Sequence, residues 1–423
     1  MCTVLTRFCT LHFSLFVIHY LDSPFSVSEN ASFGSFDTYG TKETKLLFSK
    51  QCDKITHIIF QGGIYMKALI AAGGTGGHIN PGIAIANMLK EKGYEIIFVG
   101  TERGLETDLV PKAGYDIKLI HAAGLKRRFT LENIKVLFTM KKGIDECKKI
   151  IEEEKPDIVI GTGGYVTAPL MSAALKKKIP TLIHESNALP GKTTKLFANK
   201  VDCVAVGFEE AIKRLPNCKN PVCTGNPTRM KSDCDKKTIK EKLGIQKPLL
   251  LVFGGSQGAQ KLNEVMVELI NNNMFGNYEV IYATGQKHYD EIMSKITKVP
   301  ENVKVEKYIY NMEEVMNASD LVLCRSGALT VSELSVIGVA SILIPFPHAA
   351  ENHQYYNAKT LENIEAGIII EEKDLTTEIL INKINELMSQ KEKLKTMGEN
   401  AKKIGKPDAI KKVEEEINKL LEN

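Results

Sequence analysis

Two glycine-rich loops, far apart in the chain, each lie between a short apolar run and a helix-forming stretch. The first loop is residues 73–78 (Gly-Gly-Thr-Gly-Gly-His), which follow the apolar run 68–72. The second is residues 254–258, which follow the run 249–253. Glycine lets the backbone approach a ligand closely, and the amides at a helix start favour negative charge. Two such loops in one chain predict two similar domains that share a site.

Apolar runs rich in β-branched residues alternate with helical stretches from Met66 onward. The first series is 96–99, 117–120, 158–160, 181–183, 201–206 and 222–224, and the second is 249–253, 280–283, 303–305, 321–323, 341–344 and 367–370. This alternation is typical of parallel strands joined by right-handed helical crossovers. The sequence therefore predicts an α/β fold with two doubly wound, Rossmann-like sheets.

The boundaries of the expected domains follow from breaks in this alternation. Gly225-Asn226-Pro227-Thr228-Arg229 and a polar stretch through Lys237 have the composition of a linker. We expect a first domain at 66–226 and a second at 227–404. Gly405-Lys406-Pro407 then separates a last helix, 405–423, that can pack back on the first domain.

The first 65 residues differ from the rest because their apolar residues follow no clear helix or strand period. The stretch 4–21 is apolar but contains Arg7, His12 and His19. It is therefore a poor membrane span, and it lacks a clear signal-peptide cleavage site. We expect translation to start at Met66, which makes residues 1–65 a start-site artefact; a genuine membrane anchor is the alternative.

Composition narrows the class of protein. The apolar fraction of 43% and the charged fraction of 25% are those of a soluble globular protein. A net charge of +4 is too small to indicate a nucleic-acid partner. The nine cysteines include no Cys-x-x-Cys pair, which favours reduced thiols.

His78 directly follows the first glycine loop and is the first candidate for catalysis. A neutral imidazole at this position could accept a proton, although a histidine that only braces the loop is an equally good interpretation. No acidic residue ends the second strand, where Val99-Gly100-Thr101 stands at the expected ribose position. This absence disfavours binding of a nicotinamide dinucleotide.

Two later segments of the first half should border the same site, because ligands bind at the carboxyl ends of parallel strands. They are Gly161-Thr162-Gly163-Gly164-Tyr165 and His184-Glu185-Ser186-Asn187. Glu185 is a possible base, and Asn187 could bind a sugar hydroxyl. Ordinary turn chemistry is the alternative for both segments.

The second half contains a segment, 324–333, that follows a strand and opens a helix. Its first amides could hold phosphate, and Glu333 could accept both hydroxyls of a ribose. The alternative is a helix capped by Ser326 with Glu333 exposed. His348 and His353 lie in the polar loop that comes next. They lack the spacing of two histidines that bind one metal ion from a helix, so no metal is expected. Asp233-Cys234-Asp235 is best interpreted as a solvated turn.

A basic amphipathic stretch spans residues 126–142. Lys126, Arg127 and Arg128 precede a helical pattern with Phe138 on its apolar face and Lys142 near its end. Such a helix can lie on an anionic membrane surface. Packing on a protein core is the commoner alternative.

Seven segments together resemble glycosyltransferase family 28. In chain order they are 73–78, 163–169, 184–191, 224–229, 254–258, 325–333 and 345–358. One departure is Ser186, where the family usually has Gln. Residues 1–65 have no counterpart in the family.

The resemblance implies a GT-B fold, in which two such domains face a central cleft. It implies inverting transfer of GlcNAc from UDP-GlcNAc to the C4 hydroxyl of MurNAc in lipid I, which yields lipid II and UDP in peptidoglycan synthesis. It also implies a peripheral enzyme on the cytoplasmic side of the cell membrane, with no cofactor and no nucleic acid. Cell-wall and division machinery are possible protein partners.

The resemblance also assigns roles to residues. It makes His78 the first choice of catalytic base and Glu185 the second. The residues it implies for substrate binding are Thr75, Gly76, Gly77, Asn187, Arg229, Ser256, Ile309, Ala328, Leu329, Thr330, Val331, Ser332, Glu333 and Gln354. A UDP-GlcNAc epimerase of the same fold is the nearest alternative, followed by a nicotinamide dehydrogenase and a non-catalytic nucleotide-sugar subunit.

Overall fold

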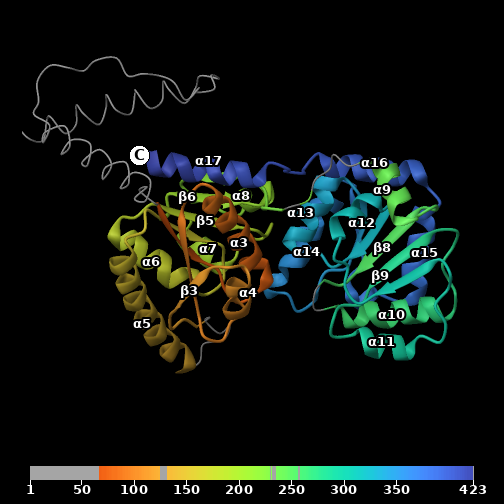
Figure 1. Cartoon of the computed structure of the whole chain (residues 1–423), viewed down its shortest axis with the longest axis horizontal. Helices are drawn as coiled ribbons and strands as arrows, with labels where there is room; N and C mark the ends of the chain where they lie inside the picture. The colour runs from red at the N-terminus through yellow and green to blue at the C-terminus, as the bar shows by residue number, and fades with distance from the viewer. Residues whose placement is uncertain (1–65, 124–130, 229, 231–234, 256–257, 423) are drawn as a thin grey trace, which may run out of the picture. The chain divides into compact units, whose positions relative to one another are not determined.

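The computed structural model describes residues 66–123, 131–228, 230, 235–255 and 258–422. Predictions about residues 1–65, including the start site, fall outside this part of the chain. Two separate parallel sheets account for all the strands of the described residues (Figure 1).

The first sheet has seven parallel strands in the order β3-β2-β1-β4-β5-β6-β7. Their bounds are β1 (Lys67–Ala71), β2 (Glu95–Gly100), β3 (Asp116–Leu119), β4 (Ile158–Gly161), β5 (Thr181–Glu185), β6 (Cys203–Val206) and β7 (Pro221–Cys223). The run expected at 201–206 is strand only from Cys203, because the N–H of Val201 still bonds the carbonyl of Phe197 in the turn that closes the preceding helix.

Helices cover both faces of this sheet. They are α3 (Gly76–Glu91), α4 (Glu106–Lys112), α5 (Leu131–Glu154), α6 (Thr167–Lys177), α7 (Lys192–Phe197) and α8 (Glu209–Lys213). Leu69 and Ala71 of β1 pack into the core on the α5 and α6 side. Ala68 and Ile70 pack into the core on the α3 side. Successive strand residues thus enter opposite cores, which explains why β1 is apolar throughout.

The second sheet has six parallel strands in the order β10-β9-β8-β11-β12-β13. Their bounds are β8 (Leu249–Phe253), β9 (Glu279–Ala283), β10 (Val303–Glu306), β11 (Leu321–Cys324), β12 (Ala340–Leu343) and β13 (Gly367–Ile369). The α-helices that follow the first sheet, apart from the last, are α9 (Lys236–Leu243), α10 (Gln260–Asn271), α11 (Tyr289–Lys295), α12 (Met312–Ala318), α13 (Ala328–Ile337), α14 (His353–Glu362), α15 (Thr377–Met388) and α16 (Lys391–Lys402). The prediction of two doubly wound α/β sheets is confirmed.

The strand orders explain where the glycine loops lie. In the first sheet the order reverses between β1 and β4, and in the second between β8 and β11. In open α/β sheets the loops that leave neighbouring strands at such a point diverge, which leaves a crevice for ligands. The loops at 73–78 and 254–258 follow β1 and β8, so both lie at a switch point.

The last helix, α17 (Ala409–Glu422), packs against α3 of the first half. Val413 and Ile417 are fully buried in the core that contains Ala68 and Ile70. The chain passes from the first half to the second near residue 225 and returns to the first half near residue 406. A Cβ on Gly225, whose φ is +87°, would lie 2.4 Å from the Cβ of Lys406, so the two crossings run in contact.

We expect Ile417→Ala to lower the free energy of unfolding by about 2–4 kcal/mol, because it removes a fully buried side chain from that core. Chemical denaturation measures the change. Asn418→Ala, at the exposed next position, serves as the matched control and should change stability by less than about 0.5 kcal/mol. Equal effects of the two variants would contradict the packing described for α17.

Candidate active site

The first glycine loop holds His78 in a defined orientation. Thr75 is the N-cap of α3, and Gly76 and Gly77 form the start of its first turn. His78 Nδ1 donates a hydrogen bond to the Gly73 carbonyl at 3.1 Å. Because a carbonyl only accepts, Nδ1 carries the proton, and the lone pair of the neutral ring is on Nε2. The same contact therefore braces the loop and prepares Nε2 to accept a proton.

The loop after β4 packs directly on the first glycine loop. A Cβ on Gly163 would lie 2.5 Å from the His78 ring, and one on Gly164 would lie 2.3 Å from the Gly73 carbonyl oxygen. Both glycines have positive φ, at +111° and +82°. Only glycine satisfies both demands, and the two loops therefore form one unit around His78.

Glu185 organises the loop that contains it. Its buried carboxylate accepts hydrogen bonds from Asn187 N (3.0 Å), Asn187 Nδ2 (3.2 Å), Gly191 N (2.8 Å) and Thr194 Oγ1 (2.6 Å). Both oxygens are thereby occupied by residues of its own segment. This geometry favours His78 over Glu185 as the base.

Asn357 joins the loop of Asn187 to the loop that opens α13. Its Oδ1 accepts from Ala188 N at 2.9 Å, and its Nδ2 lies 3.2 Å from both the Asn187 Oδ1 and the Ser326 carbonyl. Asn357 is fully buried on α14. The sequence pattern gives no sign of this role, although Asn357 lies in the matching segment 345–358. The missing information was its burial, which the residue type does not reveal.

Asn226 makes a second connection of the same kind. Its Nδ2 donates to the Ser186 carbonyl and to Ser332 Oγ, each at 2.9 Å. The contact uses the backbone of residue 186. The departure from the family pattern at Ser186 therefore leaves this connection in place.

The start of α13 divides the predicted donor-binding residues into two groups. Val331 N bonds the Gly327 carbonyl, and the Val331 side chain is fully buried in the core. Ser332 is also buried and bonded to Asn226. The groups that remain for a ligand are the first amides of the helix, at Ala328, Leu329 and Thr330, and the Glu333 carboxylate.

Glu333 is half-buried rather than exposed. Burial raises its pKa to about 7, while a hydrogen bond with Thr228 acts in the opposite direction. Ser326, the cap expected for this helix, instead donates its Oγ proton to the Gln354 carbonyl at 2.9 Å. The alternative of a Ser326 cap with an exposed Glu333 is therefore wrong.

The polar loop at 345–354 is closed by a hydrogen bond between two of its own residues. Gln354 Oε1 accepts from Phe346 N at 2.9 Å. The pKa of His353 is lowered chiefly by burial; interaction with His78 also lowers it, whereas interaction with Glu185 raises it. These electrostatic interactions place α14 of the second half within range of the His78 and Glu185 loops of the first.

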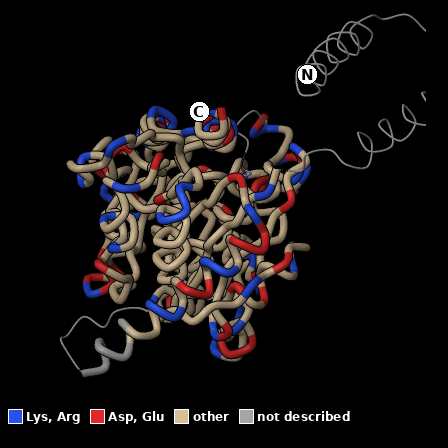
Figure 2. The backbone as a smooth tube through the Cα atoms, turned by 90° about the vertical axis from the view of Figure 1, so that its left-hand side faces the viewer, with Lys and Arg blue, Asp and Glu red and all other residues tan. Residues whose placement is uncertain are grey.

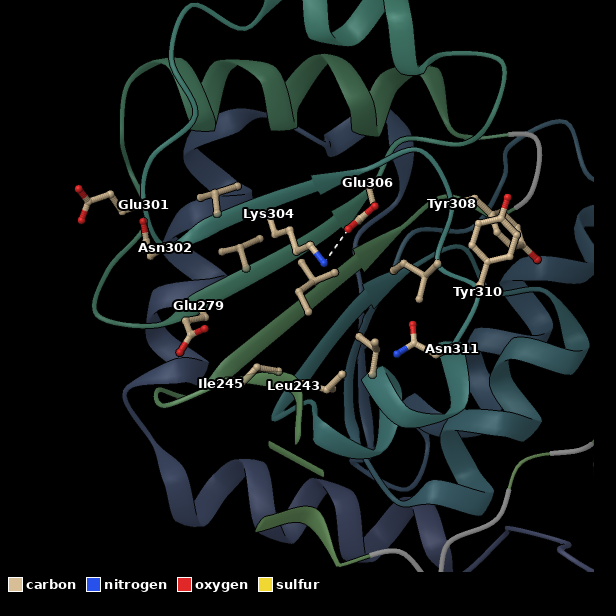
Figure 3. Close-up of a pocket in the computed structure, with 15 residues that line it drawn as sticks. Leu243, Ile245, Glu279, Glu301, Asn302, Lys304, Glu306, Tyr308, Tyr310 and Asn311 are labelled. Atoms are coloured by element: carbon tan, nitrogen blue, oxygen red, sulfur yellow. Dashed lines mark ion pairs between the residues drawn. The ribbon is translucent and has the colours of Figure 1, made fainter. Parts of the chain in front are cut away.

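Ile309 lies on a surface pocket of about 270 Å³ along β9 and β10. Figure 3 shows Tyr308 and Tyr310 where β10 has ended, with Glu301 and Asn302 at the opposite end of the strand. Lys304 and Glu306 form an ion pair within the pocket at 2.7 Å. The residues lining it include none from the loops around His78.

Several predicted residues cannot be placed. Arg229, Ser256, Asp233 and Cys234 lie outside the described residues, as do Lys126, Arg127 and Arg128. Asp235 caps α9 by accepting from Lys237 N and Thr238 N. Within the part of the chain that the structure describes, no group of three His, Cys, Asp or Glu side chains is arranged to hold a metal ion.

We expect Asn357→Ala to lower the free energy of unfolding by about 1–3 kcal/mol, because it leaves the buried Ala188 N–H without its acceptor. Chemical denaturation provides the measurement. Asn363→Ala, on an exposed residue at the end of the same helix, is the matched control. A change at Asn357 no larger than that at Asn363 would contradict the proposed connection between the loops.

Two family models match the chain, one for each sheet. The glycosyltransferase family 28 N-terminal domain matches residues 68–206, and the C-terminal domain of the same family matches residues 249–413. Together they cover more than half of the chain.

Curated relatives agree with these matches. The chain is 45% identical over 365 residues to the UDP-N-acetylglucosamine--N-acetylmuramyl-(pentapeptide) pyrophosphoryl-undecaprenol N-acetylglucosamine transferase of Acetivibrio thermocellus, with 85% of this chain and 99% of the relative covered. A Bacillus cereus protein of the same name, numbered 1, is 43% identical over 366 residues, covering 84% of this chain and all of the relative.

Solved structures give the same fold. The crystal structure of Acinetobacter baumannii MurG superposes with a TM-score of 0.72 at 28% identity, covering 84% of this chain and 99% of MurG. A putative UDP-N-acetylglucosamine 2-epimerase from Listeria monocytogenes reaches 0.56 at 16% identity, covering 82% of this chain and 94% of that protein, and shares the fold alone. The predicted GT-B architecture is thus confirmed, and the chain belongs to glycosyltransferase family 28.

Proposed function

We propose that the protein transfers GlcNAc from UDP-GlcNAc to the C4 hydroxyl of MurNAc in lipid I, forming lipid II and UDP. The observation that carries the proposal is the orientation of His78, whose Nδ1 is bonded to Gly73 and whose Nε2 is left to accept a proton. The names of the relatives from Acetivibrio thermocellus and Bacillus cereus support this donor and this acceptor.

In the proposed donor site, the second half holds UDP-GlcNAc. The amides of Ala328, Leu329 and Thr330 face the diphosphate, and the Glu333 carboxylate accepts from the ribose hydroxyls. Gln354 contacts the sugar, and the backbone at Ile309 contacts uracil. Arg229 and Ser256 complete this proposal from outside the described residues.

In the proposed reaction, Nε2 of His78 takes the proton of the C4 hydroxyl as that oxygen attacks the anomeric carbon of GlcNAc. The new O4–C1 bond forms while the bond from C1 to the UDP oxygen breaks, which inverts the anomeric centre. The departing diphosphate gains negative charge, and the amides at the start of α13 stabilise that charge. Thr75, Gly76, Gly77 and Asn187 position the reacting sugars.

In this proposal the first half is the acceptor and membrane side, and α5 lies on the cytoplasmic leaflet. Phe138 of α5 is 71% exposed, which is unusual for a large apolar side chain. Figure 2 shows basic and acidic residues interspersed over this side of the molecule. Among the described helices, none is both long and apolar enough to cross a bilayer. Peripheral contact through α5 and the preceding basic residues is the mode that we propose.

We expect Phe138→Ser to weaken binding to vesicles with anionic lipid by about 10-fold, because the variant no longer inserts an aromatic ring. Sedimentation with vesicles measures the partition coefficient. Ile379→Ser, at an exposed apolar position on α15, is the matched control and should bind as the unchanged protein does. Binding that is the same for all three proteins would contradict the contact through α5.

The proposed activity is tested by UDP release from UDP-GlcNAc in the presence and absence of a lipid I analogue. We expect release that depends on the analogue. Release of free sugar without it would favour the epimerase alternative, and UDP binding with no release under either condition would indicate a non-catalytic subunit.

A further inference from the structure

Glu106 is a fully buried carboxylate beside the first glycine loop. It is the first residue of α4, and it accepts hydrogen bonds from Gly74 N (3.0 Å), Thr101 N (3.1 Å) and Thr101 Oγ1 (2.9 Å). No lysine, arginine or histidine of the described residues forms an ion pair with it. A buried carboxylate held only by neutral donors is costly, so its position calls for a specific explanation.

The surrounding glycines make room for this carboxylate. A Cβ on Gly104 would lie 1.9 Å from Glu106 Oε2, and one on Gly100 would lie 2.8 Å from Glu106 Cγ. Thr101 Oγ1 also contacts Tyr165 Oη at 3.2 Å. Because the Thr101 proton is donated to Glu106, the tyrosine is the donor in this contact. The segments that follow β1 and β2 thus bond the carboxylate directly, and the segment that follows β4 reaches it through Thr101.

A single peptide group connects Glu106 to His78. The N–H of Gly74 and the carbonyl of Gly73 belong to the same planar unit. Its N–H donates to Glu106, and its carbonyl accepts from His78 Nδ1. Hydrogen bonds in such a chain polarise one another, so the negative charge of Glu106 increases the accepting strength of the Gly73 carbonyl.

We infer that Glu106 is a positioning residue for His78, acting through the Gly73–Gly74 peptide. The inference rests on the proposed role of His78 as the base. Glu106 holds the carbonyl that fixes the Nδ1–H tautomer, and it stabilises the positive charge that forms on the ring when Nε2 takes the acceptor proton. A carboxylate does this by direct contact in a catalytic triad; here a peptide group lies between them.

The hydrogen bond between Gly74 N and Glu106 also explains why the first glycine loop differs from a nucleotide-binding loop. In a dinucleotide-binding fold the amides of this loop face a phosphate. Here the Gly74 amide is already bonded to a carboxylate of the protein itself. The loop therefore serves the histidine that follows it rather than a nucleotide.

Other groups also face His78 and contribute to its environment. Gly163 and Gly164 cover the ring and the Gly73 carbonyl, and Tyr165 follows them on the same loop. His353 of α14 interacts electrostatically with both His78 and Glu185. None of these groups bonds the Gly73–Gly74 peptide through its side chain. A change at Glu106 therefore tests the connection from Glu106 through this peptide to His78, which we call the relay.

The kinetic test uses Glu106→Gln in the full chain, with pH–rate profiles for acceptor-dependent UDP release. The glutamine has the shape of the glutamate without its charge. We expect kcat to fall about 10-fold and the acid limb of kcat/KM for the acceptor to move to lower pH, with donor affinity unchanged. Glu416→Gln, which removes a buried carboxylate on α17, is the matched control and should leave the profile in place.

A double-mutant cycle separates the relay from general destabilisation. In a His78→Ala background, Glu106→Gln should have little further effect on kcat, because the relay ends at the missing ring. Multiplicative losses in kcat, with the pH profile of Glu106→Gln unchanged, would overturn the inference and leave Glu106 with a structural role.

A spectroscopic readout keeps the inference testable apart from catalysis. In ¹⁵N-histidine spectra, with His78 assigned by its absence in His78→Ala, the unchanged protein should show the Nδ1–H tautomer. Its protonation midpoint should fall by about half a pH unit or more in Glu106→Gln. An unmoved midpoint in a folded variant would refute the relay. Absence of lipid-dependent UDP release in the unchanged protein would instead refute the proposed function.

Discussion

His78→Ala should lower kcat for acceptor-dependent UDP release by about 10²- to 10³-fold, with donor affinity unchanged. The ring contributes a proton acceptor at Nε2 in our proposal, and general base catalysis typically supplies an effect of this size. In our proposal the donor is held by α13 and α14, so removing a side chain of α3 should not alter its dissociation constant. Steady-state kinetics with a lipid I analogue, together with calorimetric titration of UDP-GlcNAc, measures both quantities.

His78→Asn is a useful second variant because it keeps a polar group near the Gly73 carbonyl without a base at the Nε2 position. It should be as inactive as His78→Ala but closer to the unchanged protein in stability. Near-normal turnover by either variant would remove His78 from the base role. Glu185, whose oxygens are both occupied by its own loop, would then need to release a hydrogen bond to act.

Glu333→Gln should weaken the binding of UDP-GlcNAc by about 10- to 100-fold. In our proposal the carboxylate accepts from two ribose hydroxyls, and hydrogen bonds to a charged group contribute about 1.5–3 kcal/mol. Calorimetric titration without acceptor measures the dissociation constant. Ser332 is the adjacent residue, but Ser332 Oγ is bonded to Asn226, so Ser332→Ala should affect the donor less.

The affinity of the unchanged protein for UDP-GlcNAc should depend on pH. Burial raises the pKa of Glu333 to about 7, so part of the population is protonated at neutral pH. A protonated carboxyl has to lose its proton to accept from both hydroxyls. The affinity should therefore rise from pH 6 to pH 8, and Glu333→Gln should abolish this dependence. A pH dependence retained in the glutamine variant would assign it to another group.

The strands and their arrangement could be predicted because the local pattern determines them. Runs such as 249–253 and 321–323 are apolar at successive positions, which is typical of strands buried on both faces. The loops that follow β1 and β8 could be proposed as site loops because their glycines and their position between a strand and a helix are also local features; the reversal of strand order beside them was not predicted. Even the small error at Val201 has a local cause, since the turn after α7 still includes Val201 and the strand begins two residues later than expected, at Cys203.

The contacts that shape the site could not be predicted, because each depends on residues far apart in the chain. Glu106 has the position of an ordinary residue in the first turn of a helix, and only the fold shows that it bonds Gly74. Asparagine is a residue type that is common on helix surfaces, but Asn357 is buried and bonds Ala188, which lies 169 positions earlier in the chain. That both oxygens of Glu185 are occupied likewise depends on where α7 begins, because Gly191 N and Thr194 Oγ1 lie at its start.

The structure of the reaction product tests the central proposal most directly. The protein is incubated with UDP-GlcNAc and a lipid I analogue, and the lipid product is analysed by mass spectrometry and NMR. We expect one added GlcNAc, joined by a β linkage to O4 of MurNAc, with one UDP released for each. An α linkage, attachment at another hydroxyl, or conversion of the donor sugar without transfer to the lipid would contradict the proposed reaction.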